Sequence, residues 1–155
     1  MGLEIEKKFL IKNDNWKETV LEEKEISQGY LSANPNRTVR VRIMGKDGFI
    51  TIKSKSKSSV RSEFEYEIPI DDAKELMELC EKPILAKTRH FVKHENHNWE
   101  IDVFEKENKG LVVAEIELTR ENESFLIPDW IGNEVTEETK YYNSQLIQNP
   151  YSNWD

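Results

Sequence analysis

Charged residues recur at every second position through most of this chain. The amino-terminal run carries Glu4, Glu6 and Lys8, with apolar residues in most of the gaps. Because alternate side chains of a β-strand point to the same face, such a run forms a strand with one charged side and one apolar side. The pattern returns in later segments, in Arg40/Arg42, Lys53/Lys55, Glu63/Glu65/Glu67, Lys87/Arg89, Glu100/Asp102 and Glu115/Glu117. A chain with this pattern is constrained to form mostly strands.

The period-two pattern predicts eight strands. They lie at about 3–12, 26–33, 37–44, 48–55, 61–69, 84–94, 98–106 and 111–119. The turn signals Gly45-Lys46-Asp47-Gly48 and Glu107-Asn108-Lys109-Gly110 make the strands beside them antiparallel. The chain has 155 residues, the size of one ordinary domain. We therefore expect a single domain over residues 1–155, built as a closed eight-stranded antiparallel β-barrel.

Three other segments favour helices. Asp14 can cap a helix that reaches Leu21, Asp71 can cap a second helix, and Thr136 can cap a third that ends near Ile147. We expect these three helices to pack outside the barrel.

The charged faces of the strands could point either to solvent or into the barrel. Alternation by itself favours the ordinary half-buried sheet, in which the charged side faces water. The sign of the charge favours the other arrangement, because each strand carries almost a single sign and like charges at neighbouring same-face positions repel. A divalent metal bound with a polyphosphate would bridge such blocks, since carboxylates hold the metal and cations hold the phosphate. We therefore expect a barrel with a charged interior.

The composition limits the partners and the location of the protein. The formal net charge of −8 opposes general binding to nucleic acid and gives no polybasic signal for a membrane surface. The single cysteine cannot form an internal disulfide, and the amino terminus carries no apolar run. We expect a cytoplasmic protein that binds a small anionic molecule, and either a monomer or a homodimer fits the sequence.

The charged motifs, taken together and in this order, resemble the CYTH superfamily, also called the triphosphate tunnel metalloenzymes. Glu4-x-Glu6-x-Lys8 resembles the opening motif of the family, and the charged pairs given above follow in the family's order. The stretch 134–143 resembles the carboxy-terminal signature, with Glu138 and Lys140 where aspartate and arginine are more usual. The resemblance implies a barrel enclosing a tunnel that binds a triphosphate and a divalent metal. Compact members of this length look most like inorganic triphosphatases.

The two signs of charge divide the candidate site into two groups. Cations are assigned to the phosphate oxygens of the substrate, and they are Lys8, Arg40, Arg42, Lys53, Lys87 and Arg89. Carboxylates are assigned to two Mg²⁺ or Mn²⁺ ions per site, with Glu4, Glu6, Glu115 and Glu117 as first choices. Barrel closure would set these two acidic pairs opposite each other. Glu63, Glu65 and Asp102 are second choices, as outer ligands, as groups that position water, or as partners of the cations.

Other polar residues have alternative roles. Glu65 or Glu117 could accept the proton of the attacking water, although a metal-bound water needs no dedicated base. Tyr30 could hydrogen-bond Lys87 and tune it, or be a barrel aromatic with its hydroxyl in solvent. Glu67 and Glu100 suit a solvated rim as well as the interior. We expect the cations beside the serine- and lysine-rich run 54–59 to be surface residues, namely Lys55, Lys57 and Arg61.

The leading expectation for function is a metal-dependent inorganic triphosphatase that cleaves tripolyphosphate to diphosphate and phosphate, with weaker action on nucleoside triphosphates. An adenylate cyclase of the same superfamily is the first alternative. A polyphosphate-binding module without catalysis is the second, although binding alone would not require both acidic pairs.

Overall fold

The computed structural model describes residues 2–55, 57 and 59–154. The two ends of the expected domain, residues 1 and 155, and two positions of the serine- and lysine-rich run, 56 and 58, lie outside these ranges. The described residues form nine strands of one sheet: β1 (Gly2–Ile11), β2 (Val20–Ser32), β3 (Arg37–Met44), β4 (Asp47–Ser54), β5 (Val60–Ile68), β6 (Leu85–His94), β7 (His97–Phe104), β8 (Val112–Glu117) and β9 (Ile131–Glu134).

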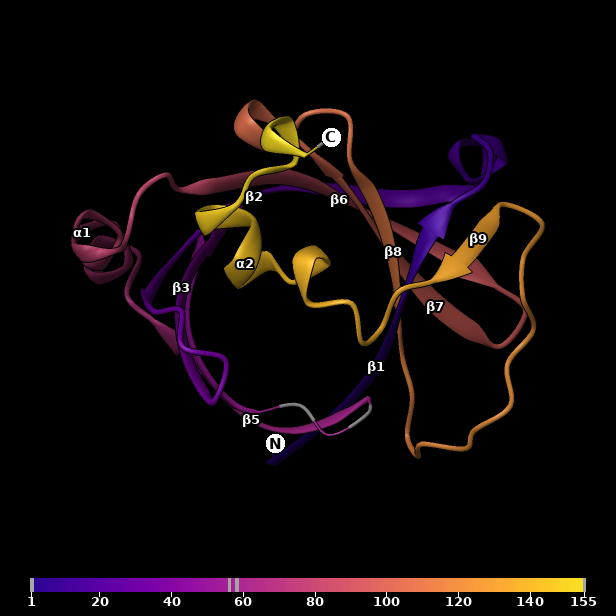
Figure 1. The fold of residues 1–155 in the computed structure, drawn as a ribbon, viewed down its shortest axis with the longest axis horizontal. Helices are drawn as coiled ribbons and strands as arrows, with labels where there is room; N and C mark the ends of the chain where they lie inside the picture. Colours follow the sequence, from indigo (N-terminus) through magenta and orange to yellow (C-terminus); the bar gives the residue numbers. More distant parts are fainter. Residues whose placement is uncertain (1, 56, 58, 155) are drawn as a thin grey trace.

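The first eight strands close into a barrel (Figure 1). Strand β1 closes it, because its first half pairs with β5 and its second half pairs with β8. Every pairing is antiparallel, in the order β5-β4-β3-β2-β6-β7-β8-β1 and back to β5. The predicted eight-stranded antiparallel barrel is confirmed. Strand β9 is an addition, which pairs with the far end of β1.

The helices differ from the prediction in two of three places. Helix α1 (Ile70–Leu79) is present, but it begins after Pro69 and Asp71 lies in its first turn. The prediction of a helix that reaches Leu21 is wrong, since only a short 3₁₀ turn, η1 (Asn15–Thr19), forms before β2. The strand prevails from Val20 onward because β2 pairs along most of its length with β6.

The carboxy-terminal segment also differs from the prediction. Thr136 caps no helix; its hydroxyl oxygen accepts a hydrogen bond from the backbone N–H of Lys8 at 3.1 Å. The segment forms a 3₁₀ turn, η3 (Thr139–Tyr141), and one short helix, α2 (Asn143–Gln148). Two more 3₁₀ turns are η2 (Lys106–Asn108) and η4 (Tyr151–Asn153). The prediction of three outer helices is wrong here, because α2 lies across one end of the barrel and only α1 packs outside it (Figure 1).

One apolar cluster lies between the outer face of the barrel and its coverings, and a second fills one end of the barrel beneath α2. Outward-facing residues of β1, β7 and β8 pack beneath Trp16 of η1 and Trp130, which precedes β9. A second cluster joins Tyr30 and Leu85, which share the inward-facing side of their strands, to Leu146 and Ile147 of α2. Because the apolar side chains of the first cluster are buried outside the barrel, the charged side chains that alternate with them on β1, β7 and β8 point inward.

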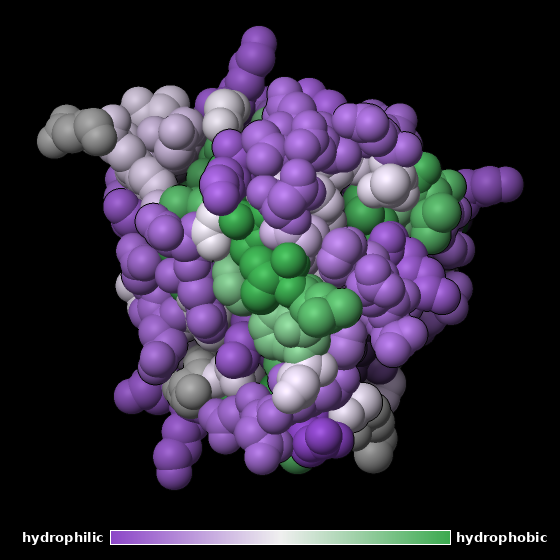
Figure 2. All heavy atoms as spheres, turned by 90° about the vertical axis from the view of Figure 1, so that its right-hand side faces the viewer, coloured by the Kyte–Doolittle hydropathy of each residue, from purple (hydrophilic) through white to green (hydrophobic). Residues whose placement is uncertain are grey.

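The segment between β8 and β9 runs along one side of the barrel (Figure 1). Figure 2 shows this side of the molecule, where an apolar patch is surrounded by hydrophilic residues. Leu126 and Ile127 of this segment are exposed, whereas Phe125 packs edge-on against Phe9 and Trp99. Among the described residues, no helix is long and apolar enough to cross a bilayer.

Candidate functional site

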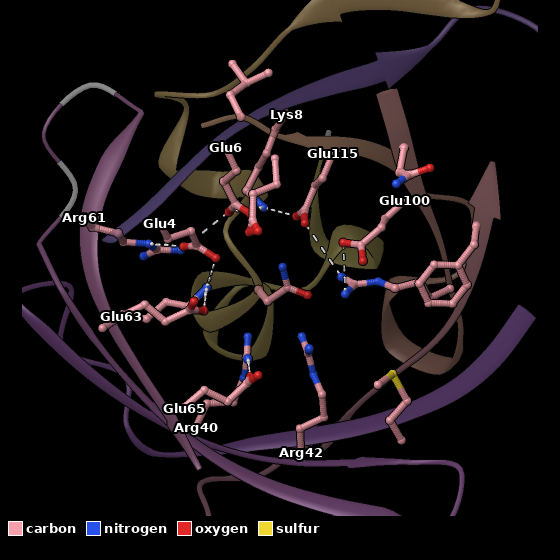
Figure 3. A pocket seen from close by; sticks show the side chains of 18 of the residues that line it. Glu4, Glu6, Lys8, Arg40, Arg42, Arg61, Glu63, Glu65, Glu100 and Glu115 are labelled. Atoms are coloured by element: carbon pink, nitrogen blue, oxygen red, sulfur yellow. Dashed lines mark hydrogen bonds and ion pairs between the residues drawn. The ribbon is translucent and has the colours of Figure 1, made fainter. Parts of the chain in front are cut away.

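The barrel encloses a cavity of about 920 Å³. Its lining contains every residue predicted for the site except Asp102, which lies behind the cations. Figure 3 shows Glu4, Glu6, Lys8 and Glu115 on one side of the cavity and Arg40 and Arg42 pointing toward them from the other. The cavity therefore has an acidic wall, formed by Glu4, Glu6, Glu115 and Glu117, and a basic wall, formed by Arg40 and Arg42.

The pairing of β1 with β8 builds the acidic wall. Glu6 lies opposite Glu117 and Lys8 lies opposite Glu115, so the two acidic pairs adjoin across this seam as predicted. Lys8 forms a buried ion pair with Glu115, and Glu115 keeps a pKa well below its ordinary value because Lys8 and Arg89 outweigh the effect of burial.

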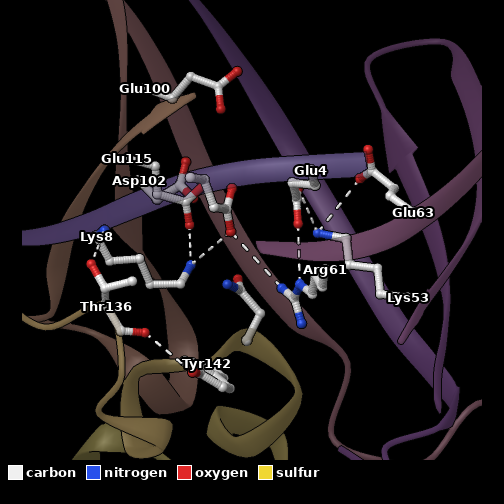
Figure 4. Close-up of polar contacts among 12 residues, drawn as sticks. Glu4, Lys8, Lys53, Arg61, Glu63, Glu100, Asp102, Glu115, Thr136 and Tyr142 are labelled. Carbon is white, nitrogen blue, oxygen red and sulfur yellow. Dashed lines mark hydrogen bonds and ion pairs between the residues drawn. The ribbon is translucent and has the colours of Figure 1, made fainter. Parts of the chain in front are cut away.

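Glu4 is also well compensated by cations. Its carboxylate accepts hydrogen bonds from Lys53 at 2.9 Å and from Nε of Arg61 at 3.1 Å (Figure 4). Burial alone would raise the pKa of Glu4, but these two cations outweigh it and lower the pKa to about 2.

Among the described residues no cation lies within ion-pair distance of Glu117, and Glu6 is only weakly compensated. Its nearest cations are Lys8 at 3.8 Å and Arg61 at 3.9 Å, both beyond hydrogen-bond distance. Burial, together with the charges of Glu115 and Glu4, raises the pKa of Glu6 to about 7. Burial and neighbouring carboxylates also raise the pKa values of Glu117 and Glu63. This part of the cavity disfavours its own negative charge, so a bound cation would be stabilised there.

The basic wall shows the opposite imbalance. Nε of Arg42 donates to Gln28 at 3.0 Å, and among the described residues no carboxylate lies within ion-pair distance of Arg42. Burial, with Arg40 and Arg89 nearby, lowers the pKa of Arg42 to about 9. Arg40 donates to Thr51 at 3.1 Å and Glu65 at 3.4 Å, but its buried Nε finds no partner in the described part of the chain. An anion bound between these two guanidinium groups would stabilise the positive charge of each.

Strand β6 contributes two more cations, which share one carboxylate. Asp102 accepts from Lys87 at 2.7 Å and from two nitrogens of Arg89 at 2.8 and 2.9 Å. Despite its burial, Asp102 keeps a pKa below the ordinary value because Arg89 and Lys87 are so close. With both oxygens engaged, Asp102 holds the cations in place and offers less to a metal than Glu6 does.

Arg61 lines the cavity, so its assignment to the surface is wrong. Burial lowers its pKa less than Glu4 and Glu6 raise it. Its position could have been found, since it shares the odd numbering of the inward-facing Glu63 and Glu65 on β5. Lys55 and Lys57 are exposed as expected.

Tyr30 does not reach Lys87. Its buried hydroxyl accepts a hydrogen bond from Nε2 of Gln28 at 3.2 Å. The proposed tuning of Lys87 by Tyr30 is therefore wrong in this structure, because Lys87 bonds Asp102 and Asn143 instead. Glu100 lines the cavity and pairs with Arg89 at 3.2 Å, whereas Glu67 is exposed and lies outside the lining.

Metal ligands are not preassembled in this arrangement. Among residues 2–55, 57 and 59–154, no three carboxylate, histidine or cysteine side chains converge at the spacing of a metal site. The donor set still fits a hard cation, since the undercompensated oxygens of Glu6 and Glu117 lie at paired positions of β1 and β8. Mg²⁺ needs only one or two such carboxylates, with phosphate and water completing its shell.

Three residues of the carboxy-terminal segment also line the cavity; the carboxy-terminal signature contains two of them, but none was predicted for the site. They are Tyr142, Asn143 and Ser144, at the start of α2. The ring of Tyr142 lies 5.9 Å from the guanidinium of Arg61, and Asn143 accepts a hydrogen bond from Lys87. Period-two reasoning cannot find them because they do not lie on a strand.

Comparison with known proteins agrees with this geometry. The family model of the CYTH domain matches residues 2–150. The chain belongs to the CYTH family. Among curated CYTH relatives, an inorganic triphosphatase of Acetivibrio thermocellus is 46% identical over 155 residues, covering 99% of each chain. An inorganic triphosphatase of Nitrosomonas europaea is 33% identical over 147 residues, covering 92% of this chain and 95% of that protein.

A solved structure supports the same placement within the CYTH family. The inorganic triphosphatase NE1496 is 31% identical to this chain with a TM-score of 0.67, over 92% of this chain and 96% of that one. The resemblance inferred from the ordered charged motifs is thus confirmed.

Proposed function

We propose that this protein is a metal-dependent inorganic triphosphatase that hydrolyses tripolyphosphate to diphosphate and phosphate. The single observation that carries the proposal is the opposition of the acidic and basic walls across one cavity. Each wall contains a residue whose charge the protein disfavours, as the raised pKa of Glu6 and the lowered pKa of Arg42 indicate. A chain of phosphates carrying a divalent cation compensates both walls at once, and its charge extends over its whole length. Two relatives with the name inorganic triphosphatase support the same substrate.

The cations of the tunnel would bind and orient the phosphate chain. Arg40 and Arg42 can each grip two phosphate oxygens, while Lys8, Lys53, Lys87 and Arg89 supply further positive charge. Phosphoryl transfer requires mainly such electrostatic clamping, with the attacking and leaving oxygens held in line. Asp102 and Glu115 would keep the β6 and β1 cations in place before and after the substrate binds.

The acidic wall would hold Mg²⁺ or Mn²⁺, and two ions are proposed. Glu6 and Glu117 are the leading ligands because they are the least neutralised by the protein, with Glu4, Glu115 and Glu63 beside them. Such a metal neutralises phosphate charge and lowers the pKa of bound water. Glu117 is better suited than Glu65 to accept the proton of the attacking water. Its pKa is raised, whereas Glu65 already accepts hydrogen bonds from Arg40 and Thr51.

The decisive experiment measures phosphate release from tripolyphosphate and from ATP by the purified protein with Mg²⁺ or Mn²⁺. We expect faster release from tripolyphosphate and no release after chelation of the metal. A strong preference for ATP would contradict the inorganic assignment. Formation of cyclic AMP and diphosphate would establish the cyclase alternative, and tight binding without turnover in either metal would establish a binding module.

A further inference from the structure

The ammonium of Lys87 donates hydrogen bonds to two different residues at the wall of the cavity. Lys87 is 1% exposed, and its Nζ donates to Oδ2 of Asp102 at 2.7 Å and to Oδ1 of Asn143 at 2.8 Å. An ammonium has three N–H donors. The two hydrogen bonds therefore fix the direction of the third donor, because the ammonium can no longer rotate freely about its last bond.

Asn143, which contacts Lys87, does not belong to a strand of the barrel. It is the first residue of α2, in the carboxy-terminal segment that lies across one end of the barrel. The hydroxyl of the preceding Tyr142 donates to the backbone oxygen of Thr136 at 3.1 Å, and Figure 4 shows this contact below the charged residues. Leu146, one turn later, is fully buried. Both sides of Asn143 are therefore anchored, which fixes its backbone, and the hydrogen bond with Lys87 orients its carboxamide.

The carboxamide has two ends with different chemistry. Its oxygen must face Lys87, since an ammonium has only donors and an amide NH₂ cannot accept from it. The NH₂ group therefore faces away from Lys87, and it bonds to no other group in the described part of the chain. Asn143 lines the cavity, so this NH₂ is open to whatever the tunnel binds.

We propose that Asn143 positions Lys87 through its carboxamide oxygen and donates a hydrogen bond to a phosphate oxygen of the substrate through its NH₂ group. This inference rests on the proposed function and adds a neutral recognition residue from outside the strand pattern. A neutral donor at this place orients the phosphate without adding positive charge beside Lys87, whose ammonium already lies close enough to Arg89 and Arg42 to be disfavoured by them.

Two substitutions separate this role from simple support of the fold. Asn143→Asp keeps an oxygen for Lys87 but replaces the NH₂ with a negative oxygen facing the phosphate. Asn143→Ala removes both contacts but adds no charge. A residue that only supports the fold would tolerate the nearly isosteric aspartate better than alanine. If the residue donates to phosphate, KM should rise less in Asn143→Ala than in Asn143→Asp.

The test is steady-state hydrolysis of tripolyphosphate with Mg²⁺ by the wild type, Asn143→Asp, Asn143→Ala and the control Asn133→Asp, which makes the same change at an exposed position of β9. We expect KM to rise by about tenfold or more in Asn143→Asp and by less in Asn143→Ala, with kcat lowered in Asn143→Ala because Lys87 is released. The control should match the wild type. Values of kcat and KM within about twofold of wild type in both variants would overturn the inference, as would a larger rise of KM in Asn143→Ala than in Asn143→Asp.

Two further measurements keep the inference falsifiable. If Asn143→Asp does not show cooperative unfolding, Asn143→Ser takes its place. KM should then be higher in Asn143→Ser than in the wild type. An unchanged KM would overturn the inference. If the wild type releases no phosphate, the proposed function fails by itself. Calorimetric titration with metal-free tripolyphosphate then tests the inference, which requires weaker binding by Asn143→Asp and is overturned by equal binding.

Discussion

The acidic wall and the basic wall are built by the same strand pattern but differ in how the protein compensates them. In the acidic wall, Glu4 and Glu115 have close cation partners, whereas Glu6 does not. In the basic wall, Arg40 has a carboxylate at 3.4 Å, whereas Arg42 has only the amide of Gln28. The acidic wall thus leaves the charges of Glu6 and Glu117 for a ligand, and the basic wall leaves the charge of Arg42. The difference indicates that the tunnel is balanced for a metal and a polyphosphate together.

The largest effect should come from Glu6→Gln. The substitution removes a carboxylate that no cation of the described residues contacts at hydrogen-bond distance, so kcat for tripolyphosphate should fall by about 10²-fold or more, whereas affinity for the magnesium complex should fall by only about tenfold. Steady-state kinetics and calorimetric binding of the substrate measure the two quantities separately. Glu121→Gln, an exposed position with the same change, is the control. Near-normal kcat in Glu6→Gln would remove Glu6 from the metal site.

Arg42→Ala should have the next largest effect, on both binding and turnover. The guanidinium is buried and free of a carboxylate partner among the described residues, so its removal takes away a phosphate contact together with the hydrogen bond to Gln28. We expect kcat/KM to fall by about 10- to 100-fold, equivalent to roughly 1.4–2.7 kcal/mol. Arg42→Lys should recover part of it, because lysine keeps the charge but loses the bidentate grip. Equal kinetics in Arg42→Ala and wild type would place the phosphate elsewhere.

The pH dependence of the free energy of unfolding should report on Glu6 of the acidic wall in the absence of substrate. The pKa of Glu6 is about 7 in the folded protein, above its ordinary value of 4.5. Between these values the folded state binds more protons than the unfolded state, so this residue lowers the free energy of unfolding as pH rises from 4.5 to 7. Metal-free Glu6→Gln should therefore unfold at a higher temperature than wild type at pH 8, with the difference vanishing near pH 4.5. A Glu6→Gln variant less stable than wild type at pH 8 would contradict this interpretation.

The smallest effect is expected from Glu67→Gln. Glu67 continues the inward-facing row of Glu63 and Glu65 on β5, but it is exposed and does not line the cavity. Both kcat and KM should stay within about twofold of wild type. A tenfold loss in either would mean that the functional part of the tunnel extends further along β5 than the structure indicates.

The strands and their inward residues could be predicted from the sequence because side-chain direction in a strand depends only on position along it. That rule sets Glu6 opposite Glu117 once β1 and β8 are paired, and it would also have placed Arg61 correctly. The capping signal of Asp14 is misleading, because the chain from Val20 onward pairs with β6 as strand β2 and does not continue the helix. The rule of side-chain direction cannot find Tyr142 and Asn143, because their place in the site depends on how the carboxy-terminal segment folds back over the barrel end.

The central claim is that the two walls act together on one ligand, and a binding measurement tests it most directly. The ligand is a triphosphate analogue with methylene groups in place of its bridging oxygens, titrated into the protein in its metal-free form and as its magnesium complex. We predict that the magnesium complex binds at least about tenfold more tightly to the wild type, and that Glu6→Gln loses this difference while Arg42→Ala weakens both forms. Equal affinity of the wild type for the two forms would contradict the account.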